Sequence, residues 1–301
     1  MNLTDGVDIF VGVIVDIKDP LLANRVKVRI FGLHDANETL LSNDNLPWAL
    51  VLMPNTGASM TGIGSGPHGL KNGSTVVVKF LDGIDQQVPL VVGTIMGFQD
   101  TLSGYPAAFR DSENKYPLND RLKEPDTNRL SRNQNIDKTI VPNKKRSTGV
   151  SAGSSTWDQP TDPYNAKYPN NQVIETPSGH IIELDDTEGA ERIHIRHKSG
   201  SYTEFHPNGD IVQYNVGSGY ETTDGSQNIL IKGACNITVD GDANTTIKGN
   251  STVKVDGNSD VTISGTANVN YNGNMTHKVS GNYTIEAGGI CAIKGQLITI
   301  N

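Results

Sequence analysis

The chain has 301 residues, with 25 Lys and Arg against 33 Asp and Glu, and a formal net charge of −8 at pH 7. An acidic chain is a poor candidate for binding nucleic acid or an anionic membrane through charge alone. Two cysteines are too few for a disulfide-built fold or a cysteine-ligated zinc site. No segment approaches the ~20 apolar residues of a membrane-spanning helix, and the first ten residues do not resemble a secretory signal. We therefore expect a soluble protein made in a cytoplasm, with two domains or one elongated one.

Residues 1–100 carry short alternating apolar runs separated by turn signals, which predict five β-strands. The expected strands are Val7–Ile17, Arg25–Phe31, Trp48–Met53, Thr75–Leu81 and Val88–Met96. Five short strands with a long glycine-rich connection favour a small Greek-key barrel of the OB type. Some OB barrels bind single-stranded nucleic acid through a basic groove and stacking aromatic residues. Acidic residues outnumber basic ones here and aromatic residues are few, so we expect no nucleic-acid partner.

Residues 101–171 differ in composition, with seven of the 14 prolines and few large apolar residues. Such a segment cannot build a core of its own. We interpret it as an extended Pro/Asn-rich linker, held in place by neighbouring barrels or by another protein. Strand patterning returns in residues 172–207, where the turn signals PSG, DTEG, KSG and PNG separate the runs. These runs predict a β-hairpin transition into the last part of the chain, residues 208–301.

The last part is an octapeptide repeat marked by glycine. Eleven glycines follow one another at a spacing of eight residues: Gly209, Gly217, Gly225, Gly233, Gly241, Gly249, Gly257, Gly265, Gly273, Gly281 and Gly289. The residues four and six positions after each glycine are mostly Ile or Val, and their neighbours are mostly polar. This alternation predicts one short, half-buried strand per repeat. Glycine supplies the corner, where φ > 0 or a close backbone approach costs little.

The inward-facing positions of the repeat predict a core shared between chains. They are Ile229, Ile231, Ile237, Val239, Ile247, Val253, Val255, Val261, Ile263, Val269, Val279 and Ile285. Each repeat offers only about two such side chains, so one chain cannot shield both its apolar side and its edges. Three identical chains wound into a prism close without free edges. The sequence thus predicts an all-β protein with an N-terminal OB-fold barrel, an extended linker and a C-terminal intertwined trimeric β-helix. A monomeric β-solenoid is the alternative.

Matches to catalytic patterns lack the surroundings that their chemistry needs. The sequence GVSAG at 149–153 fits a nucleophile elbow, which requires a strand before Ser151 and a helix after it. We expect a flexible Ser/Gly-rich stretch there. The sequence GIGSG at 62–66 lacks the lysine and the helix of a phosphate-binding loop, and is expected to be a barrel loop. Catalytic residues and cofactors are therefore not expected.

Two groups of polar residues are candidate sites. An acidic run is expected to be a solvated turn between strands rather than a glycosidase pair or a cation site. Its members are Glu183, Asp185, Asp186, Glu188 and Glu191. His277 occupies an inward position of the repeat, where three copies around an axis could hold a water, an anion or a metal. We expect a neutral, hydrated interior histidine there and no metal site.

Four stretches resemble the OB and transition regions of contractile-phage central spike proteins and the related VgrG proteins. They are VDIKDPLLANRVKVRIFGLH at 15–34, LPWALVLMPNTG at 46–57, GIGSGPHGLKNGSTVVVKFLDGIDQQVPLVVGTI at 62–95 and ETPSGHIIELDDTEGAERIHIRHKSGS at 175–201. The resemblance implies a homotrimeric spike in the virion tail baseplate, assembled in the host cytoplasm, and we expect this chain to be non-enzymatic. Its barrel would dock on a separate hub protein. Its prism would contact and pierce the host outer membrane when the tail sheath contracts.

This chain differs from the family in two ways, and both differences bear on its expected function. Some spikes carry a lysozyme between barrel and prism, and the linker here is too short and too polar to be one. VgrG chains begin with a large hub portion, whereas this chain starts at the barrel, which favours a phage spike over a secretion or injection system. A receptor-binding tail fibre or depolymerase is a further alternative. The apolar end Leu297, Ile298 and Ile300 is expected to contact a PAAR-type tip protein.

Overall fold

The computed structural model describes residues 9–55, 69–96, 130–131, 150–152, 155–157 and 160–299. Within these ranges the protein is all-β, and its only helical elements are two single 3₁₀ turns, η1 (Asn43–Asn45) and η2 (Gly83–Asp85). None of the described helices is long and apolar enough to cross a membrane. The chain divides into two units, residues 1–238 and 239–301.

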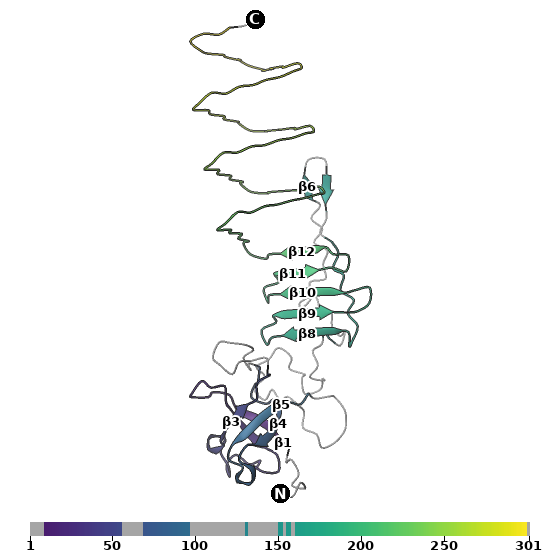
Figure 1. Cartoon of the computed structure of the whole chain (residues 1–301), viewed down its shortest axis with the longest axis vertical. Helices are drawn as coiled ribbons and strands as arrows, with labels where there is room; N and C mark the ends of the chain where they lie inside the picture. The colour runs from purple at the N-terminus through teal and green to yellow at the C-terminus, as the bar shows by residue number, and fades with distance from the viewer. Residues whose placement is uncertain are drawn as a thin grey trace. The chain divides into compact units, whose positions relative to one another are not determined.

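The N-terminal part is a closed barrel of five strands, in the order β1-β2-β3-β5-β4 (Figure 1). The strands are β1 (Phe10–Asp16), β2 (Val26–Ile30), β3 (Trp48–Val51), β4 (Thr75–Phe80) and β5 (Pro89–Thr94). All neighbours are antiparallel except β3 and β5, which pair in parallel. Closure removes the free edges that an open sheet would expose. The five strands predicted from the sequence and the OB fold are confirmed.

Alternating side chains of these strands fill the barrel. The buried cluster consists of Ile14, Val26, Val28, Ile30, Ala49, Val76, Val78 and Val91. Gly12 on β1 lies against β2, where a Cβ atom would come within 2.7 Å of both the Arg29 carbonyl oxygen and Val28 Cγ1. A glycine is required at this position because β1 and β2 approach so closely.

The turn between β1 and β2 is organised by one carboxylate. Asp19 accepts hydrogen bonds from the backbone N–H groups of Leu21, Ala23 and Arg25, at 2.9 to 3.1 Å. The Arg25 guanidinium also donates to it, with a shortest distance of 2.7 Å. The Arg25 hydrogen bond is the main cause that holds the pKa of Asp19 well below its usual range. The carboxylate thereby fixes a turn that presents Leu22 to solvent with 93% of its surface exposed.

The second sheet has five strands in chain order, from β8 to β12 (Figure 1). They are β8 (Asn171–Glu175), β9 (Ile181–Asp185), β10 (Arg192–Arg196), β11 (Tyr202–Phe205) and β12 (Ile211–Tyr214). Each connection is a tight turn at one of the predicted turn signals. The glycines that close them, Gly179, Gly189, Gly200 and Gly209, have φ between 73° and 99°. These left-handed values explain why glycine ends each signal. Gly209 therefore serves a hairpin turn of this sheet.

Residues 150–157 hold a short hairpin of β6 (Val150–Ala152) and β7 (Ser155–Trp157). The expectation of a flexible stretch around Ser151 is wrong, since Ser151 lies within β6 and pairs with Thr156. A strand rather than a helix follows it, so the nucleophile elbow is not formed. The GIGSG sequence at 62–66 lies outside the described residues.

Residues 215–299 form an open coil without assigned strands, drawn in green to yellow in Figure 1. The backbone bends at every in-register glycine from Gly217 to Gly289, together with the residue before it. Unlike Gly209, these glycines do not have positive φ, and nothing lies within 4 Å of a Cβ atom added to any of them. The predicted corner positions are thus bends, but the chain itself does not explain why glycine is needed there. The intertwined trimeric β-helix remains a prediction.

Candidate functional site

The repeat carries an apolar surface that its own chain leaves uncovered. Every described residue from Asn215 onward is exposed. The twelve predicted core residues range from 48% exposed at Val279 to 85% at Val253. Isolated exposed apolar residues are ordinary in proteins, but a regular series of them marks a surface that another molecule covers.

The remaining predicted positions of the coil are also exposed. His277 lies beside Tyr283, with 6.2 Å between the ring centres. Leu297 and Ile298 are exposed near the end of the described coil, and Ile300 lies outside the described residues. Groups of three metal-binding side chains do not occur among the described residues of this chain.

The β8–β12 sheet has one apolar face, and that face is solvent-exposed. The strand register places Leu184, Ile193, Phe205 and Ile211 in one row, and Ile174, Ile182 and Ile195 in the next. All seven are more than a third exposed. The arrangement resembles that of the coil, because both surfaces are apolar and uncovered within the chain.

The opposite face of this sheet is charged and buried. Arg192 on β10 donates to Glu183 on β9, and to Glu204 Oε2 on β11 at 2.7 Å. His194 Nδ1 lies 2.7 Å from Glu204 Oε2, and His206 Nε2 lies 2.9 Å from Glu204 Oε1. We call these five residues the ionic cluster. Burial of charge costs free energy unless the charges are paired, and here two carboxylates share one guanidinium.

The contacts within the ionic cluster shift the pKa values of Arg192 and Glu204. Burial opposes the charge of Arg192, but Glu183 and Glu204 outweigh it and raise the pKa of Arg192 above its usual value. Burial alone would raise the pKa of Glu204. The close approach of His194, whose Nδ1 lies 2.7 Å from Glu204 Oε2, and the charge of Arg192 outweigh burial, so the pKa of Glu204 lies below its ordinary value. Glu204 therefore stays ionised inside the cluster.

Residues 160–170, which we call the strap, cover the ionic cluster. The Arg192 guanidinium carbon lies 4.8 Å from the centre of the Tyr164 ring. Hydrogen bonds hold the C-terminal end of the strap, where Lys167 N–H donates to Thr187 Oγ1 at 2.9 Å. Asp186 N–H donates to the Asn170 carbonyl at 3.0 Å. Ala166 is fully buried within the strap.

A second linker segment completes this cover. Leu130 is fully buried and packs with Ile181, beside Tyr164 and Val173. Its carbonyl accepts hydrogen bonds from Asn171 Nδ2 at 2.9 Å and from the Tyr164 hydroxyl at 3.3 Å. The expectation that other barrels or another protein hold the linker is therefore wrong for these residues, because the chain's own sheet holds them.

The acidic run was expected to be solvated, and this is wrong for two of its members. Glu183 is fully buried in the ionic cluster, and Asp185 is also buried, where its carboxylate accepts from Thr187 N–H at 3.0 Å. Asp186, Glu188 and Glu191 are exposed as expected. Alternation along β9 explains the difference, since Glu183 and Asp185 point to the face that the strap covers. The sequence signal was the pair of alternating runs IIELD and RIHIR, in which charged residues share one face.

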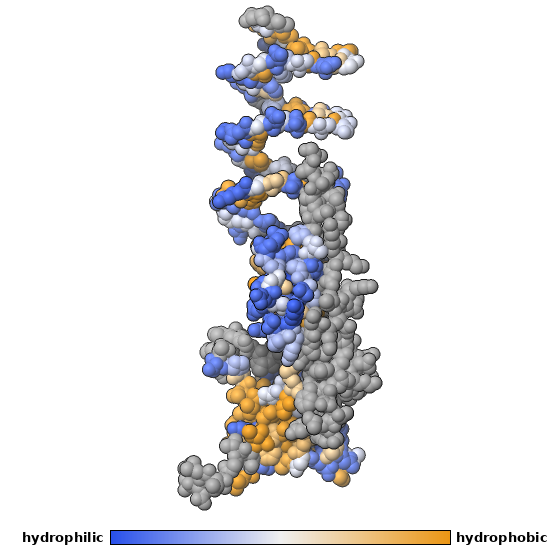
Figure 2. Space-filling model, turned by 90° about the vertical axis from the view of Figure 1, so that its right-hand side faces the viewer, coloured by the Kyte–Doolittle hydropathy of each residue, from blue (hydrophilic) through white to orange (hydrophobic). Residues whose placement is uncertain are grey.

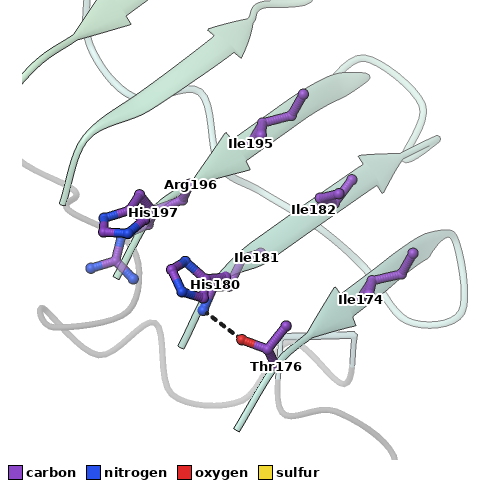
Figure 3. A pocket seen from close by; sticks show the side chains of 8 residues that line it. All are labelled: Ile174, Thr176, His180, Ile181, Ile182, Ile195, Arg196 and His197. Atoms are coloured by element: carbon purple, nitrogen blue, oxygen red, sulfur yellow. Dashed lines mark hydrogen bonds between the residues drawn. The ribbon is translucent and has the colours of Figure 1, made fainter. Parts of the chain in front are cut away.

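A shallow hollow of about 310 Å³ lies at one end of this sheet (Figure 3). Ile174, Ile182 and Ile195 line it, together with His180 and His197. The two imidazole rings are 4.5 Å apart between their centres. His180 also accepts a weak hydrogen bond from the Lys198 N–H at 3.3 Å. The hollow opens on the apolar face and continues it.

The barrel also exposes apolar side chains. Leu50 and Leu52 at β3 and Val92 on the adjacent β5 are each more than a third exposed. Figure 2 shows apolar residues gathered over one face of the barrel. This face is a second candidate surface for contact with another protein.

Comparison with known proteins agrees with this architecture. Residues 33–177 match the family described as the Gp5 N-terminal OB domain. Protein Gp5 of Vibrio phage KVP40 is 35% identical over 268 residues, which is 77% of this chain and 63% of that protein. The pre-baseplate central spike protein Gp5 of Enterobacteria phage T4 is 32% identical over 161 residues, which is 48% of this chain and 28% of that protein.

The chain thus spans less than two thirds of the length of either relative. The family match at residues 33–177 includes the barrel strands β3, β4 and β5, whereas β1 and β2 precede it. The resemblance predicted from the sequence motifs is confirmed: residues 33–177 match the Gp5 N-terminal OB domain, and the chain is similar to phage Gp5 proteins, one of which is a pre-baseplate central spike protein.

Proposed function

We propose that this protein is a structural spike of a phage tail baseplate, built as a homotrimer and without enzymatic activity of its own. The T4 relative is a pre-baseplate central spike protein, and this similarity supports the role and the location in the virion tail. The single observation that carries the proposal is the uncovered apolar series along the coil, from Ile229 to Ile285.

Burial of that series requires other chains. The coil makes one bend for each octapeptide, and no β-strand is assigned to any repeat among the described residues of this chain. Copies of the same coil have the same period, and each can pair with the next all along its length. Three chains close the arrangement without a free edge and bring the Ile and Val pairs onto one axis.

The β8–β12 sheet supports the same assembly. Its apolar face continues the pattern of the coil, while its charged face is already covered by the strap. Residues such as Ile193 and Leu184 are therefore available to another copy, and the ionic cluster is not. The proposed domain boundaries are barrel 1–100, linker 101–171, hairpin transition 172–207 and triple-stranded β-helix 208–301, and the sheet of the hairpin transition extends to Tyr214 at the end of β12.

Two further contacts are proposed from exposed apolar side chains on the barrel and on the coil. The apolar outer face of the barrel, with Leu50, Leu52 and Val92, is the proposed docking surface for a separate baseplate hub protein. The exposed Leu297 and Ile298 are the proposed contact for a PAAR-type tip protein. Contact with the host outer membrane is transient and mechanical, with the work supplied by contraction of the tail.

The mass of the native protein tests this proposal. Light scattering on unheated protein is expected to give three times the chain mass of 32.3 kDa. The trimer should resist SDS until it is heated, because intertwined chains must unfold before they separate. A monomer would overturn the trimeric assembly and favour a single-chain solenoid. Clearing of peptidoglycan by the purified protein in a zymogram would overturn the non-enzymatic role.

A further inference from the structure

We propose that neighbouring copies of this chain join through the two ends of the β9–β10 hairpin, with two histidines of one copy against two carboxylates of the next. The histidines are His180 and His197, which we call the histidine end. The carboxylates are Asp186 and Glu191, which we call the acidic end. The inference rests on the proposed trimer, and adds which surfaces join its copies.

Both ends lie on the apolar face of the β8–β12 sheet. Side chains alternate between the two faces of a strand, so His180 and Asp186 belong to the same face as Ile182 of β9. Burial follows this alternation without a break over residues 181–187, where every second residue is exposed. The chain therefore carries a histidine before the exposed apolar residues of β9 and a carboxylate after them.

β10 repeats the pattern in the opposite direction. Glu191 precedes its exposed isoleucines and His197 follows them, and by the same alternation all of them share one face. The antiparallel register of β9 and β10, extended by one residue at either end, sets His197 opposite His180 and Glu191 opposite Asp186. The hairpin thus gathers two imidazoles at one end of the apolar face and two carboxylates at the other.

The histidine end presents hydrogen-bond donors. Its two rings lie side by side at the hollow, with 4.5 Å between their centres (Figure 3). His180 Nδ1 accepts from Lys198 N–H at 3.3 Å, and His197 Nδ1 accepts from Ser199 N–H at 3.1 Å. A neutral imidazole whose Nδ1 accepts carries its hydrogen on Nε2. Each ring therefore has an Nε2–H donor, and neither Nε2 has a partner among the described residues.

The acidic end presents acceptors on a fixed turn. Asp186 and Glu191 are exposed, and no hydrogen bond or ion pair engages either carboxylate within the described part of the chain. The backbone that carries them is held, since Asp186 N–H donates to the Asn170 carbonyl at 3.0 Å and Ala190 N–H donates to the Thr187 carbonyl at 2.8 Å. The two ends of the face are therefore complementary in charge and in hydrogen bonding.

The two ends cannot meet within one chain. Glu191 and His197 lie at opposite ends of β10, about 20 Å apart along an extended strand. Each end therefore needs a neighbour that brings the other end. Contacts that join two different surfaces of identical copies are head-to-tail contacts, and they close into a ring when the rotation permits.

Three-fold symmetry supplies such a neighbour on both sides. The axis runs along the direction in which β8 to β12 stack, with the apolar faces turned toward it. Inward side chains at the end of one sheet and at the start of the next then converge at each junction between copies. Rotation about this axis leaves every strand at its own level. His180 therefore meets Asp186 of the next copy, and His197 meets Glu191 of the next copy.

Cross-linking of the full-length protein tests this pairing. The double variant His197→Cys with Glu191→Cys is made in a background that carries Cys235→Ala and Cys291→Ala. The two introduced thiols of one chain are too far apart for a short bifunctional maleimide, so every cross-link joins two copies. We expect a covalent trimer on a denaturing gel of heated protein, because each copy is joined to the next around the ring.

The two single variants are the matched controls. His197→Cys alone and Glu191→Cys alone should run as single chains, since each thiol faces a carboxylate or an imidazole of the next copy. Covalent dimers from either single variant would show that like ends meet, and would overturn the proposal. A double variant that is trimeric by native mass yet gives no cross-linked species would also overturn it. A wild type that is monomeric by native mass would instead refute the proposed trimer itself.

Exchange of charge provides a readout without introduced thiols. Glu191→Lys sets a cation against the histidine end of the next copy, and His197→Glu sets a carboxylate against its acidic end. Each should lower the temperature at which SDS dissociates the trimer, because like charges across an interface repel. The double variant should recover that temperature, since the exchanged ends attract again. Losses that simply add in the double variant would contradict the pairing, whereas Lys198→Glu should leave the temperature unchanged because its side chain alternates to the other face.

Discussion

The Arg192 guanidinium lies over the ring of Tyr164, between the sheet and the strap, with 4.8 Å from the guanidinium carbon to the ring centre. The edge of the same guanidinium binds Glu183 and Glu204 on the strands at either side. One planar cation therefore joins β9, β10, β11 and the strap. Arginine suits this role because its donors point along its edge while its faces remain free for aromatic contact.

Removal of that cation should destabilise the protein strongly. The Arg192→Met variant leaves Glu183 and Glu204 buried without their shared partner, and breaking a buried pair in this way costs about 3–5 kcal/mol. In a titration with guanidinium chloride, this variant should unfold at a lower midpoint concentration of denaturant than the wild type. Lys254→Met is the matched control, since the Lys254–Asp256 pair lies on the surface. An unchanged midpoint for Arg192→Met would contradict the role of the cluster.

The Tyr164 hydroxyl should make the strap sensitive to alkali. Burial, and then the nearby charge of Glu183, raise the pKa of Tyr164 to about 12 from an ordinary value of 10.0. Stability from the neutral phenol is complete below pH 10.0 and is lost as the pH rises toward 12. The melting temperature should therefore fall more steeply between about pH 9 and about pH 11 for the wild type than for Tyr164→Phe. Tyr220→Phe, at an exposed position, should follow the wild type.

Two barrel glycines should respond differently to the same substitution. Gly12→Ala places a Cβ atom 2.7 Å from the Arg29 carbonyl oxygen, and the strands must move apart to accept it. Overpacking of this kind costs about 1–3 kcal/mol. Gly93→Ala meets nothing within 4 Å and should leave the melting temperature unchanged or slightly higher. Equal melting temperatures for the two variants would show that β1 and β2 are not so closely packed.

A charge on the apolar face of the sheet should prevent assembly. Ile193→Asp places an unpaired carboxylate where a second copy is proposed to pack, and a buried charge without a partner is costly. The barrel core does not include this residue, so the chain should remain folded by circular dichroism while its native mass falls. Lys198→Asp, in the exposed turn after β10, should leave the mass unchanged. If Ile193→Asp formed the trimer in normal yield, this face would not be part of the interface between copies.

The repeat glycines offer a direct comparison between one chain and several. A Cβ atom at Gly257 meets nothing within 4 Å in the single chain, so Gly257→Val is sterically free there. In an intertwined prism, another chain approaches the corner, and the trimer yield should fall well below that of Lys254→Ala. Similar yields from the two variants would mean that the corner is not a contact between chains.

Much of the local structure could be predicted from the sequence because it depends on short-range patterns. Alternation within each run defined the five barrel strands, as in Thr75–Phe80, where every second residue enters the core. The turn signals located the hairpins, since only glycine readily takes the left-handed φ at Gly179 or Gly200. The spacing of eight located the bends of the coil. Each of these features is determined by residues within about ten positions of one another.

Tertiary structure alone decided which face of the β8–β12 sheet is buried. The runs IIELD and RIHIR define an apolar face and a charged face, and burial of the apolar one would be the usual expectation. Instead the chain buries the face that holds Glu183 and Arg192. The reason lies far along the sequence, where Leu130 and Tyr164 supply the carbonyl, the ring and the apolar cover that this face needs. Alternation determines which residues share a face, whereas burial depends on what packs against it, and no local pattern carries that information.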